Sequence, residues 1–473
     1  MENFNFWDFE VWGFICLISA LLLSLLLANW LKKAIKPLRV SLIPTSVLGG
    51  VILLLLSMTY QGITGELLFD TQFFGGNGMA TMEIITYHCL ALGFVATTFR
   101  SKRRQKGMRR TVEVFNTGVT TVATYLLQGV LGMGITMIAA FLIKDFFAAS
   151  GILLPFGYGQ GTGQALNYGN IYEADHNFVG GRSFGLTIAA LGFLSAAIGG
   201  VIHLNILKKK GKIVVVDAEE GAESMSAEQI QGPDEIPMNG SIDKMTVQIA
   251  IILAVYMMAF GAIALLSLLL PGFKSVLYGF NFLLGVLMAT ILKWCMDMLR
   301  RVGMLKKEYI NPFLMNRMGG FFFDLMIVAG IAAIRLEYIV QYWHILLILA
   351  VVGAVATYCY NHFVARKLFP RYAEQQFMAM YGMLTGTAST GMILLREIDP
   401  EYKTPVADNL VYQNLPAIVF GFPMMLLATL APVKPKTTLA ILFAFFVVMN
   451  VILFRSKLFR RRRRHCTTSK KEK

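Results

Sequence analysis

Long apolar runs constrain this chain more than any other feature of its sequence. Runs of about twenty residues, each long enough to cross a bilayer as a helix, recur from end to end. The 473 residues are 56% hydrophobic and only 15% charged, with a mean hydropathy of +0.60, whereas soluble domains carry about 25% charged residues. A membrane barrel would instead show short alternating strands. The sequence therefore predicts an all-α integral membrane protein.

The apolar runs form two sets on either side of a hydrophilic connector. Residues 208–244 are rich in acidic residues, Gly, Ser and Pro, which is typical of a flexible cytoplasmic linker. We expect an N-terminal unit at 1–207, a C-terminal unit at 245–430, and an extra helix with a basic tail at 431–473. The predicted spans are Trp12–Leu31, Leu42–Tyr60, Ile84–Phe99, Thr111–Ile143, Phe184–Leu207, Met245–Leu270, Ser275–Lys293, Pro312–Ile334, Val340–Phe363, Leu410–Leu430 and Thr437–Phe454.

Basic residues gather in short clusters beside these runs. The net charge is +15, and its Lys and Arg concentrate at 32–39, 100–110, 208–212, 300–307 and 460–464. Such clusters mark the cytoplasmic side of membrane proteins and do not indicate nucleic-acid binding. We therefore expect the N-terminus outside and the C-terminus in the cytoplasm. The last cluster predicts contact with anionic lipid headgroups.

Sequence signals of catalysis are weak. The chain has no HExxH motif and no nucleophile elbow, and its His, Asp and Glu residues form no tight sequence cluster. Five scattered cysteines without CxxC spacing indicate neither a disulfide framework nor a zinc site. We expect a protein that is not an enzyme and has no resident cofactor.

A short motif occurs once in each half and interrupts apolar sequence. Phe156–Gly163 reads FGYGQGTG and Tyr381–Ala388 reads YGMLTGTA, so both contain aromatic-Gly, three residues, and Gly-Thr-small. Backbone that leaves the helix at membrane depth is tolerated only where protein buries it or water reaches it. Two breaks in corresponding positions are the best sequence indication of a transporter's binding site. The alternative is a Gly/Thr-rich helix that packs tightly on a neighbour.

Charge placement puts the two motifs on opposite sides of the membrane. With the basic clusters inside, the first motif enters from outside and the second from the cytoplasm. We expect re-entrant hairpins near 147–172 and 375–396, in an inverted-topology repeat of two five-helix halves plus one extra C-terminal helix. Pro416, which follows two side-chain amides, predicts a further broken span that faces a cavity.

The motif residues are the first candidates for binding a substrate and an ion. Carbonyl groups freed at a helix break suit Na⁺, while amides at the start of a half-helix suit a carboxylate. We predict a Na⁺ site at the backbone of Gly161, Thr162, Gly386 and Thr387. The full set of hairpin candidates is Gln160, Gly161, Thr162, Gly163, Thr385, Gly386, Thr387, Ser389 and Thr390.

Three polar residues outside the motifs complete the candidates. Asp324 lies within an apparent span, where a carboxylate indicates function unless it pairs with Arg317 near the cytoplasmic end. Arg396 would hold a substrate carboxylate, or it is an anchor that Glu397 neutralises. Asn116 begins a polar stripe that either lines the path of the solute or hydrogen-bonds to other helices.

The order and spacing of these motifs resemble the bacterial sodium/glutamate symporters over residues 12–430. Ile43–Gly50, IPTSVLGG, is similar to that family's Ile-Pro-Glu-Pro-Val-x-Gly-Gly, and Gly159–Gly163 is similar to its Gly-His-Gly-Thr-Gly. The resemblance implies Na⁺-coupled uptake of glutamate or a related small organic anion across a bacterial plasma membrane. It also implies a homodimer and elevator-like motion.

The chain departs from that family's pattern around both motifs. Gln160 stands where the family has His, and Thr385–Thr390 differs from its Gly-Ala-Thr-Pro-Thr-Ala pattern. We therefore expect a divergent member whose substrate is a different carboxylate or amino acid, if it is not glutamate. A channel or a membrane enzyme is the alternative class.

Overall fold

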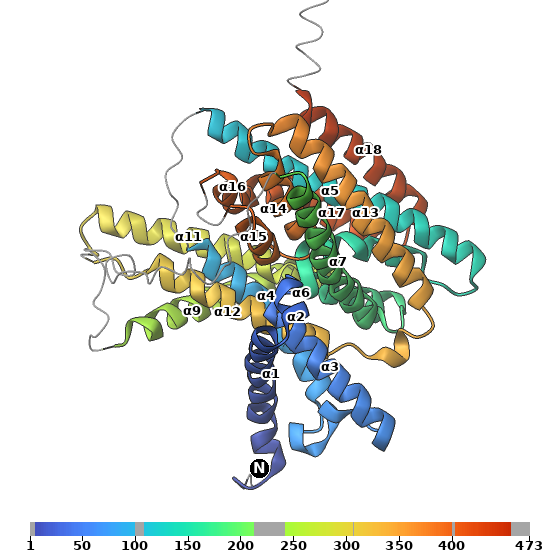
Figure 1. Ribbon diagram of the computed structural model, residues 1–473. Helices are drawn as coiled ribbons and strands as arrows, with labels where there is room; N and C mark the ends of the chain where they lie inside the picture. Colours follow the sequence, from blue (N-terminus) through green and yellow to red (C-terminus); the bar gives the residue numbers. More distant parts are fainter. Residues whose placement is uncertain (1–4, 100–107, 212–241, 306, 400–402, 456–473) are drawn as a thin grey trace, which may run out of the picture.

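The computed structural model is all-helical across the residues that it describes, which are 5–99, 108–211, 242–305, 307–399 and 403–455 (Figure 1). Ten of the helices in this part of the chain are long and apolar enough to span a membrane. A bent pair of helices at the C-terminal end of the second unit makes an eleventh candidate. The prediction of a helical, multi-pass membrane protein is confirmed.

Each predicted span corresponds to one helix, except that Ser275–Lys293 covers α10 and part of α11, and Leu410–Leu430 covers the end of α16 and α17. The first unit contains α1 Phe9–Ala34, α2 Lys36–Val40, α3 Thr45–Thr64, α4 Gly78–Thr98, α5 Met108–Leu142, α6 Leu153–His176 and α7 Gly181–Lys209. The second contains α9 Lys244–Leu269, α10 Lys274–Gly279, α11 Asn281–Arg301, α12 Pro312–Ala332, α13 Trp343–Leu368, α14 Ala373–Thr385, α15 Ala388–Arg396, α16 Val406–Tyr412 and α17 Asn414–Leu430, and α18 Pro435–Leu453 follows it. Most of the predicted connector and the whole basic tail at 460–464 lie outside the described residues.

Local sequence explains where several helices begin and end. The Asn311 side chain accepts a hydrogen bond from the Leu314 amide at 2.7 Å, and Pro312 occupies the first position of α12. Asp243 caps α9 in the same way through the amides of the first turn. Gly65, with φ of 80°, ends α3 in the left-handed conformation that glycine adopts without strain.

Helices pack on one another both within and between the two units. Helix α1 packs on α3, and α9 packs on α11. Helix α3 packs on α12, and α11 packs on α4; α7 packs on α13, and α17 packs on α5. Helices α4 and α12 lie against each other, since Gly93 leaves room for Phe323 and Gly319 leaves room for Thr97. The two units therefore share one packed interior, with α6, α14 and α15 near the middle of the view in Figure 1.

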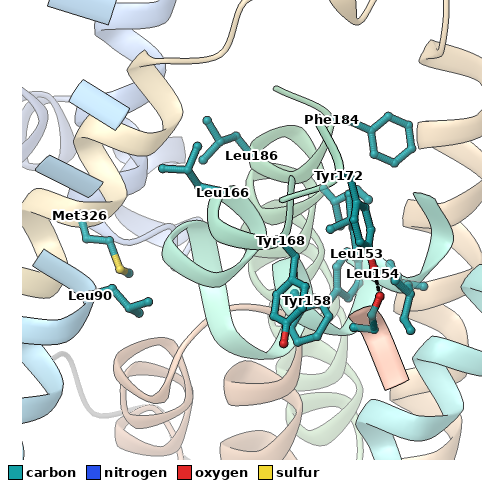
Figure 2. Packing of buried hydrophobic residues seen from close by; sticks show 14 of the residues in the cluster. Leu90, Leu153, Leu154, Tyr158, Leu166, Tyr168, Tyr172, Phe184, Leu186 and Met326 are labelled. Atoms are coloured by element: carbon teal, nitrogen blue, oxygen red, sulfur yellow. Dashed lines mark hydrogen bonds between the residues drawn. The ribbon is translucent and has the colours of Figure 1, made fainter. Parts of the chain in front are cut away.

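A buried aromatic core fixes α6 in this interior (Figure 2). The hydroxyl of Tyr158 donates to the Ala350 carbonyl at 2.7 Å. Those of Tyr168 and Tyr172 donate to the carbonyls of Met425 at 2.9 Å and Ala428 at 2.6 Å. A buried phenol needs such a partner, and each partner here belongs to the second unit. Three tyrosines of the first unit thus attach α6 to α13 and α17.

The close approach of α6 and α7 gives a test of the fold. A Cβ added at Gly185 would meet the Ala165 carbonyl group, whereas one added at Gly134 of α5 would meet nothing within 4 Å. We expect Gly185→Ala to lower the free energy of unfolding by about 1–3 kcal/mol through overpacking. Gly134→Ala removes a helix-interior glycine without a clash and is expected to be neutral or stabilising by up to about 1 kcal/mol.

Thermal unfolding of the two purified variants in detergent measures this difference. A Gly185→Ala variant as stable as Gly134→Ala would show that the two helices do not pack at this distance.

Candidate functional site

The first sequence motif contains a break in α6. Gly161 has φ of 79° and ψ of −168°, a conformation that is essentially restricted to glycine. The Phe156 and Tyr168 rings stack with centroids 4.0 Å apart, although twelve residues of straight helix would separate them by about 18 Å. Phe147 likewise lies 5.5 Å from Tyr172. The chain therefore folds back on itself as a hairpin with Gly161 at its tip.

The second motif contains a corresponding break between α14 and α15. Gly386 has φ of −141° and ψ of −106°, and Thr387 is extended. Helix α15 returns along α14, since a Cβ at Gly391 would lie 2.5 Å from the Ala379 carbonyl oxygen and one at Gly382 would lie 2.9 Å from the Gly391 Cα. This segment is a second hairpin with its tip at Gly386 and Thr387.

The two tips meet. A Cβ at Gly161 would lie 3.1 Å from the Thr387 Cγ2 and 3.8 Å from the Met326 Cε. Phe193 of α7 is buried beside both tips, 3.1 Å from a Cβ at Gly386 and 4.0 Å from one at Gly161. Residues that the sequence places in separate halves thus share one site.

A cavity of about 810 Å³ lies beside the tips. This volume falls in the range of small-molecule sites. Both hairpins line it, and α4, α5, α11, α12, α16 and α17 form its other walls. Its hairpin residues are Gly159, Gln160, Met383, Thr387, Ala388, Ser389 and Met392. Its other polar residues are Thr97, Thr121, Tyr125, Asn316, Arg317, Asp324, Gln413 and Asn414.

Helix α12 supplies the cavity with one positive and one negative side chain. Arg317 and Asp324 are two turns apart on one helix face, about 10.5 Å along the axis. The Arg317 guanidinium lies 5.3 Å from the Phe313 ring centroid, and the Asp324 carboxyl lies near the Ser46 side chain. No ion pair between the two charges is found among the described residues. Their electrostatic potential is therefore directed into the cavity.

Two predicted residues of the first hairpin, Thr162 and Gly163, are buried and do not line the cavity. The Thr162 hydroxyl is buried and donates to the Met326 carbonyl at 3.2 Å. Gly163 is buried where a Cβ would lie 2.8 Å from both the Leu90 Cδ1 and the Met326 Sδ. Gln160, on the other side of Gly161, reaches the cavity. The motif therefore divides into two lining residues, Gly159 and Gln160, and residues that hold the tip against α4 and α12.

The second hairpin divides in the same way. Thr387 and Ser389 line the cavity, while Thr385 and Thr390 are buried. The Thr385 hydroxyl donates to the Tyr381 carbonyl at 2.7 Å, one turn earlier in α14. The hydroxyl oxygens of Thr387 and Thr390 are 3.4 Å apart. Thr385 and Thr390 thus use their side chains to shape the tip.

Arg396 and Asn116 lie away from the tips. Arg396 is exposed at the far end of α15, about 13 Å along the helix from Thr387. Its charge acts on Glu397, where burial raises the pKa of the carboxyl and the adjacent guanidinium opposes that rise. Asn116 accepts a hydrogen bond from Arg455 at 3.2 Å, at the end of α18. Neither side chain lines the cavity.

Two members of the polar stripe on α5 hold the second hairpin; the stripe consists of Asn116, Thr117, Thr120, Thr121, Thr124 and Gln128. Thr117 bonds to Gln376 of α14 at 3.3 Å. Gln128 donates to the Leu384 carbonyl at 2.8 Å, just before the tip. Thr121 alone in this stripe lines the cavity. Of the two alternatives for the stripe, hydrogen bonding to other elements describes most of its members.

Two residues that line the cavity, Arg317 and Gln413, were not among the binding candidates from the sequence. Arg317 was considered only as a partner for Asp324, although a spacing of two helical turns places the two residues on one face of α12. Gln413 lies at the bend between α16 and Pro416–Leu430, where the two parts are 49° apart. It accepts from Thr121 at 2.5 Å and donates to the Met383 sulfur at 2.9 Å. The proline after two amides was the signal for this bend.

Comparison with known proteins does not identify the chain. No protein-family model, no curated protein and no solved structure matches it. Its resemblance to the sodium/glutamate symporters therefore stays a prediction from the motifs. Because one fold can serve many functions, the function has to be inferred from the residues and geometry of the site.

The conformation of Gly161 gives a test of the tip. Gly161→Ala forces an L-residue into a region that costs about 1–3 kcal/mol and adds a methyl group 3.1 Å from Thr387. We expect a clear loss of thermal stability. Gly65→Ala is the control for a methyl group added at positive φ without a clash, because Gly65 has nothing within 4 Å of an added Cβ and its φ of 80° and ψ of −4° lie in the milder left-handed helical region.

Unfolding temperatures of both variants in detergent measure the difference. A Gly161→Ala variant that loses no more stability than Gly65→Ala would contradict a strained, closely packed tip at Gly161.

Proposed function

We propose that this chain is a secondary transporter that carries glutamate or a related small organic anion together with Na⁺. The observation that carries the proposal is the meeting of two helix breaks, one from each unit, beside a cavity of about 810 Å³ that polar and charged side chains help to line. Broken helices in corresponding positions are how many secondary transporters build a substrate site at the middle of the membrane.

The backbone at the second tip offers partial charges of both signs. Helix α14 ends at Thr385, so the carbonyls of its last turn carry the negative end of a helix dipole. Helix α15 starts at Ala388 without a side-chain cap in the described chain, and Thr387, Ala388 and Ser389 face the cavity. Its first amides suit a carboxylate. Carbonyls of Gly161, Thr162, Gly386 and Thr387 are the proposed Na⁺ ligands.

Arg317 is the proposed partner of a substrate carboxylate. It lines the cavity, whereas Arg396 does not. A guanidinium binds a carboxylate through two parallel hydrogen bonds, which fixes the position of the substrate as well as its charge. Asp324 on the same face would bind an ammonium group or favour entry of the cation.

The corresponding helix contacts support an inverted repeat. The pairs α1–α3 and α9–α11, α3–α12 and α11–α4, and α7–α13 and α17–α5 are those expected if each unit repeats the other. With the basic clusters placed in the cytoplasm, the hairpins become re-entrant from opposite sides. The cavity then opens toward the cytoplasm, where α12 begins just after the basic residues 300–307. Alternating access, elevator-like motion and a homodimer in a bacterial plasma membrane belong to the same proposal.

The packing behind the tips favours a carrier over an open channel. Phe156, Tyr158, Tyr168 and Phe193 are all buried there. A carrier needs such a barrier on one side of its site, because substrate must reach only one face at a time.

Uptake into proteoliposomes tests the proposed function. We expect saturable accumulation of radiolabelled glutamate, or of a small dicarboxylate, that requires an inward Na⁺ gradient and collapses with a Na⁺ ionophore. Conductance that does not saturate, or uptake that is indifferent to the Na⁺ gradient, would contradict the proposal.

Substitutions of two arginines distinguish a carboxylate site in the cavity from one at the end of the second hairpin. We expect Arg317→Gln to reduce kcat/KM for uptake more than tenfold, since removing a charge partner costs several kcal/mol. Arg396→Gln should change it less than twofold. Arg301→Gln, in the exposed last turn of α11, controls for the loss of a positive charge from this side of the protein.

Initial rates over a range of substrate concentrations give KM and kcat for all three variants. Loss of uptake in Arg396→Gln with full activity in Arg317→Gln would place the carboxylate site at the end of α15 instead.

A further inference from the structure

Two histidines and a glutamate meet at a point that the transport site does not use. His203 comes from the end of α7, His362 from the end of α13, and Glu374 from the first turn of α14. One ligand atom from each lies within 4.8 Å of the other two. None of the three lines the large cavity. They are far apart in the sequence, and folding alone brings them together.

The side chains are oriented as metal ligands would be. His203 Nε2 lies 3.1 Å from the Glu374 Oε2. Its other ring nitrogen, Nδ1, lies 2.7 Å from the Tyr358 hydroxyl. Metal-bound histidines generally have such an outer partner, which fixes the ring and its tautomer. His203 is only 2% exposed, so its ring is held in place.

Aromatic rings surround the cluster. Phe377 packs on His203 with centroids 4.4 Å apart and on His362 at 5.0 Å. The Tyr358 ring stacks on His362 at 6.0 Å. An apolar shell restricts water and strengthens the attraction between an ion and its ligands.

The neighbouring Arg366 limits how Glu374 can bind an ion. Arg366 lies 3.6 Å from the Glu374 Oε1 and is about half exposed. It occupies the oxygen that faces away from His203, so Glu374 would bind an ion through Oε2 alone.

We propose that His203, His362 and Glu374 form a binding site for a divalent transition metal ion of the Zn²⁺ class. Two imidazole nitrogens and one carboxylate oxygen are a donor set that Zn²⁺ uses, at about 2.0–2.2 Å from each donor. Mg²⁺ and Ca²⁺ prefer oxygen ligands and do not suit it. Donors within 4.8 Å need only a small closing movement to share one ion.

An ion at this point would connect α14 to α7 and α13. Helix α14 is the first limb of the second hairpin, so the bound metal would fix the base of that hairpin. If the proposed transport function holds, Zn²⁺ would slow transport by restraining the hairpin. The metal site itself does not depend on that function.

Zinc binding to the purified full-length chain tests the site. His465 and Cys466 are adjacent in the sequence and are also able to bind zinc. The titrations therefore use a chain with His465→Asn and Cys466→Ser. We expect one Zn²⁺ per chain by calorimetry, no competition from Mg²⁺, and reduced hydrogen exchange over residues 373–385 when Zn²⁺ is bound.

Variants then assign the ligands. Glu374→Gln and His362→Gln should each weaken Zn²⁺ binding at least tenfold, and Tyr358→Phe should weaken it by about 10–100-fold through the outer partner of His203. His88→Gln, which removes a histidine paired with Tyr256 elsewhere, should leave it unchanged.

Two results would overturn the proposal. One is a chain that shows no stoichiometric Zn²⁺ binding. The other is undiminished Zn²⁺ binding in folded Glu374→Gln and His362→Gln variants. A transport assay tests the proposed function separately. Zinc binding without any solute uptake would support the metal site and contradict the proposal that the chain is a transporter.

Discussion

The contact between Gly161 and the Gly386–Thr387 turn is the constraint on which the rest of this interior depends. Each hairpin tip exposes backbone amides and carbonyls that have no partner within their own helix. In an apolar interior such groups are costly unless protein or water satisfies them. Each tip therefore needs a polar cavity on one side and close packing on the other. Phe193 and Met326 supply the packing, and neither unit could supply the whole arrangement alone.

The two hairpins share one kind of attachment and differ in another. Both use tyrosine hydroxyls: those of the first reach carbonyls of α13 and α17, and Tyr381 of the second donates to the Ser195 carbonyl of α7 at 2.9 Å. The second is attached to α5 by side-chain amides as well, with Gln128 at its tip and Gln376 at its base. The proposed metal site also lies at the base of this second hairpin.

Local sequence signals predicted the spans and the helix breaks, but they did not predict which distant side chains meet in the folded chain. The spans follow from hydropathy, and the breaks follow from Gly-Thr motifs whose conformational effect is local. Arg396 looked closer to the site than Arg317 because it follows the hairpin in sequence. The return limb of a hairpin, however, carries its last residue away from the tip. The pairing of Asn116 with Arg455, and the meeting of His203 with Glu374, depend on how distant helices pack, which no local pattern specifies.

The charges of the cavity bear on why the proposed transporter would need Na⁺. Arg317 and Asp324 lie on one face of α12 and formally cancel, so the wall as a whole offers an anion little net attraction. A dicarboxylate would bring one or two uncompensated negative charges into a site of low dielectric, where such charges are costly. A Na⁺ ion at the carbonyls of the tips would offset that cost within a few ångströms of the first amides of α15. Substrate and ion would then each bind better in the presence of the other, which is the thermodynamic meaning of coupling between them. On this argument coupling arises from the backbone at the two breaks, and the side chains around them select the solute.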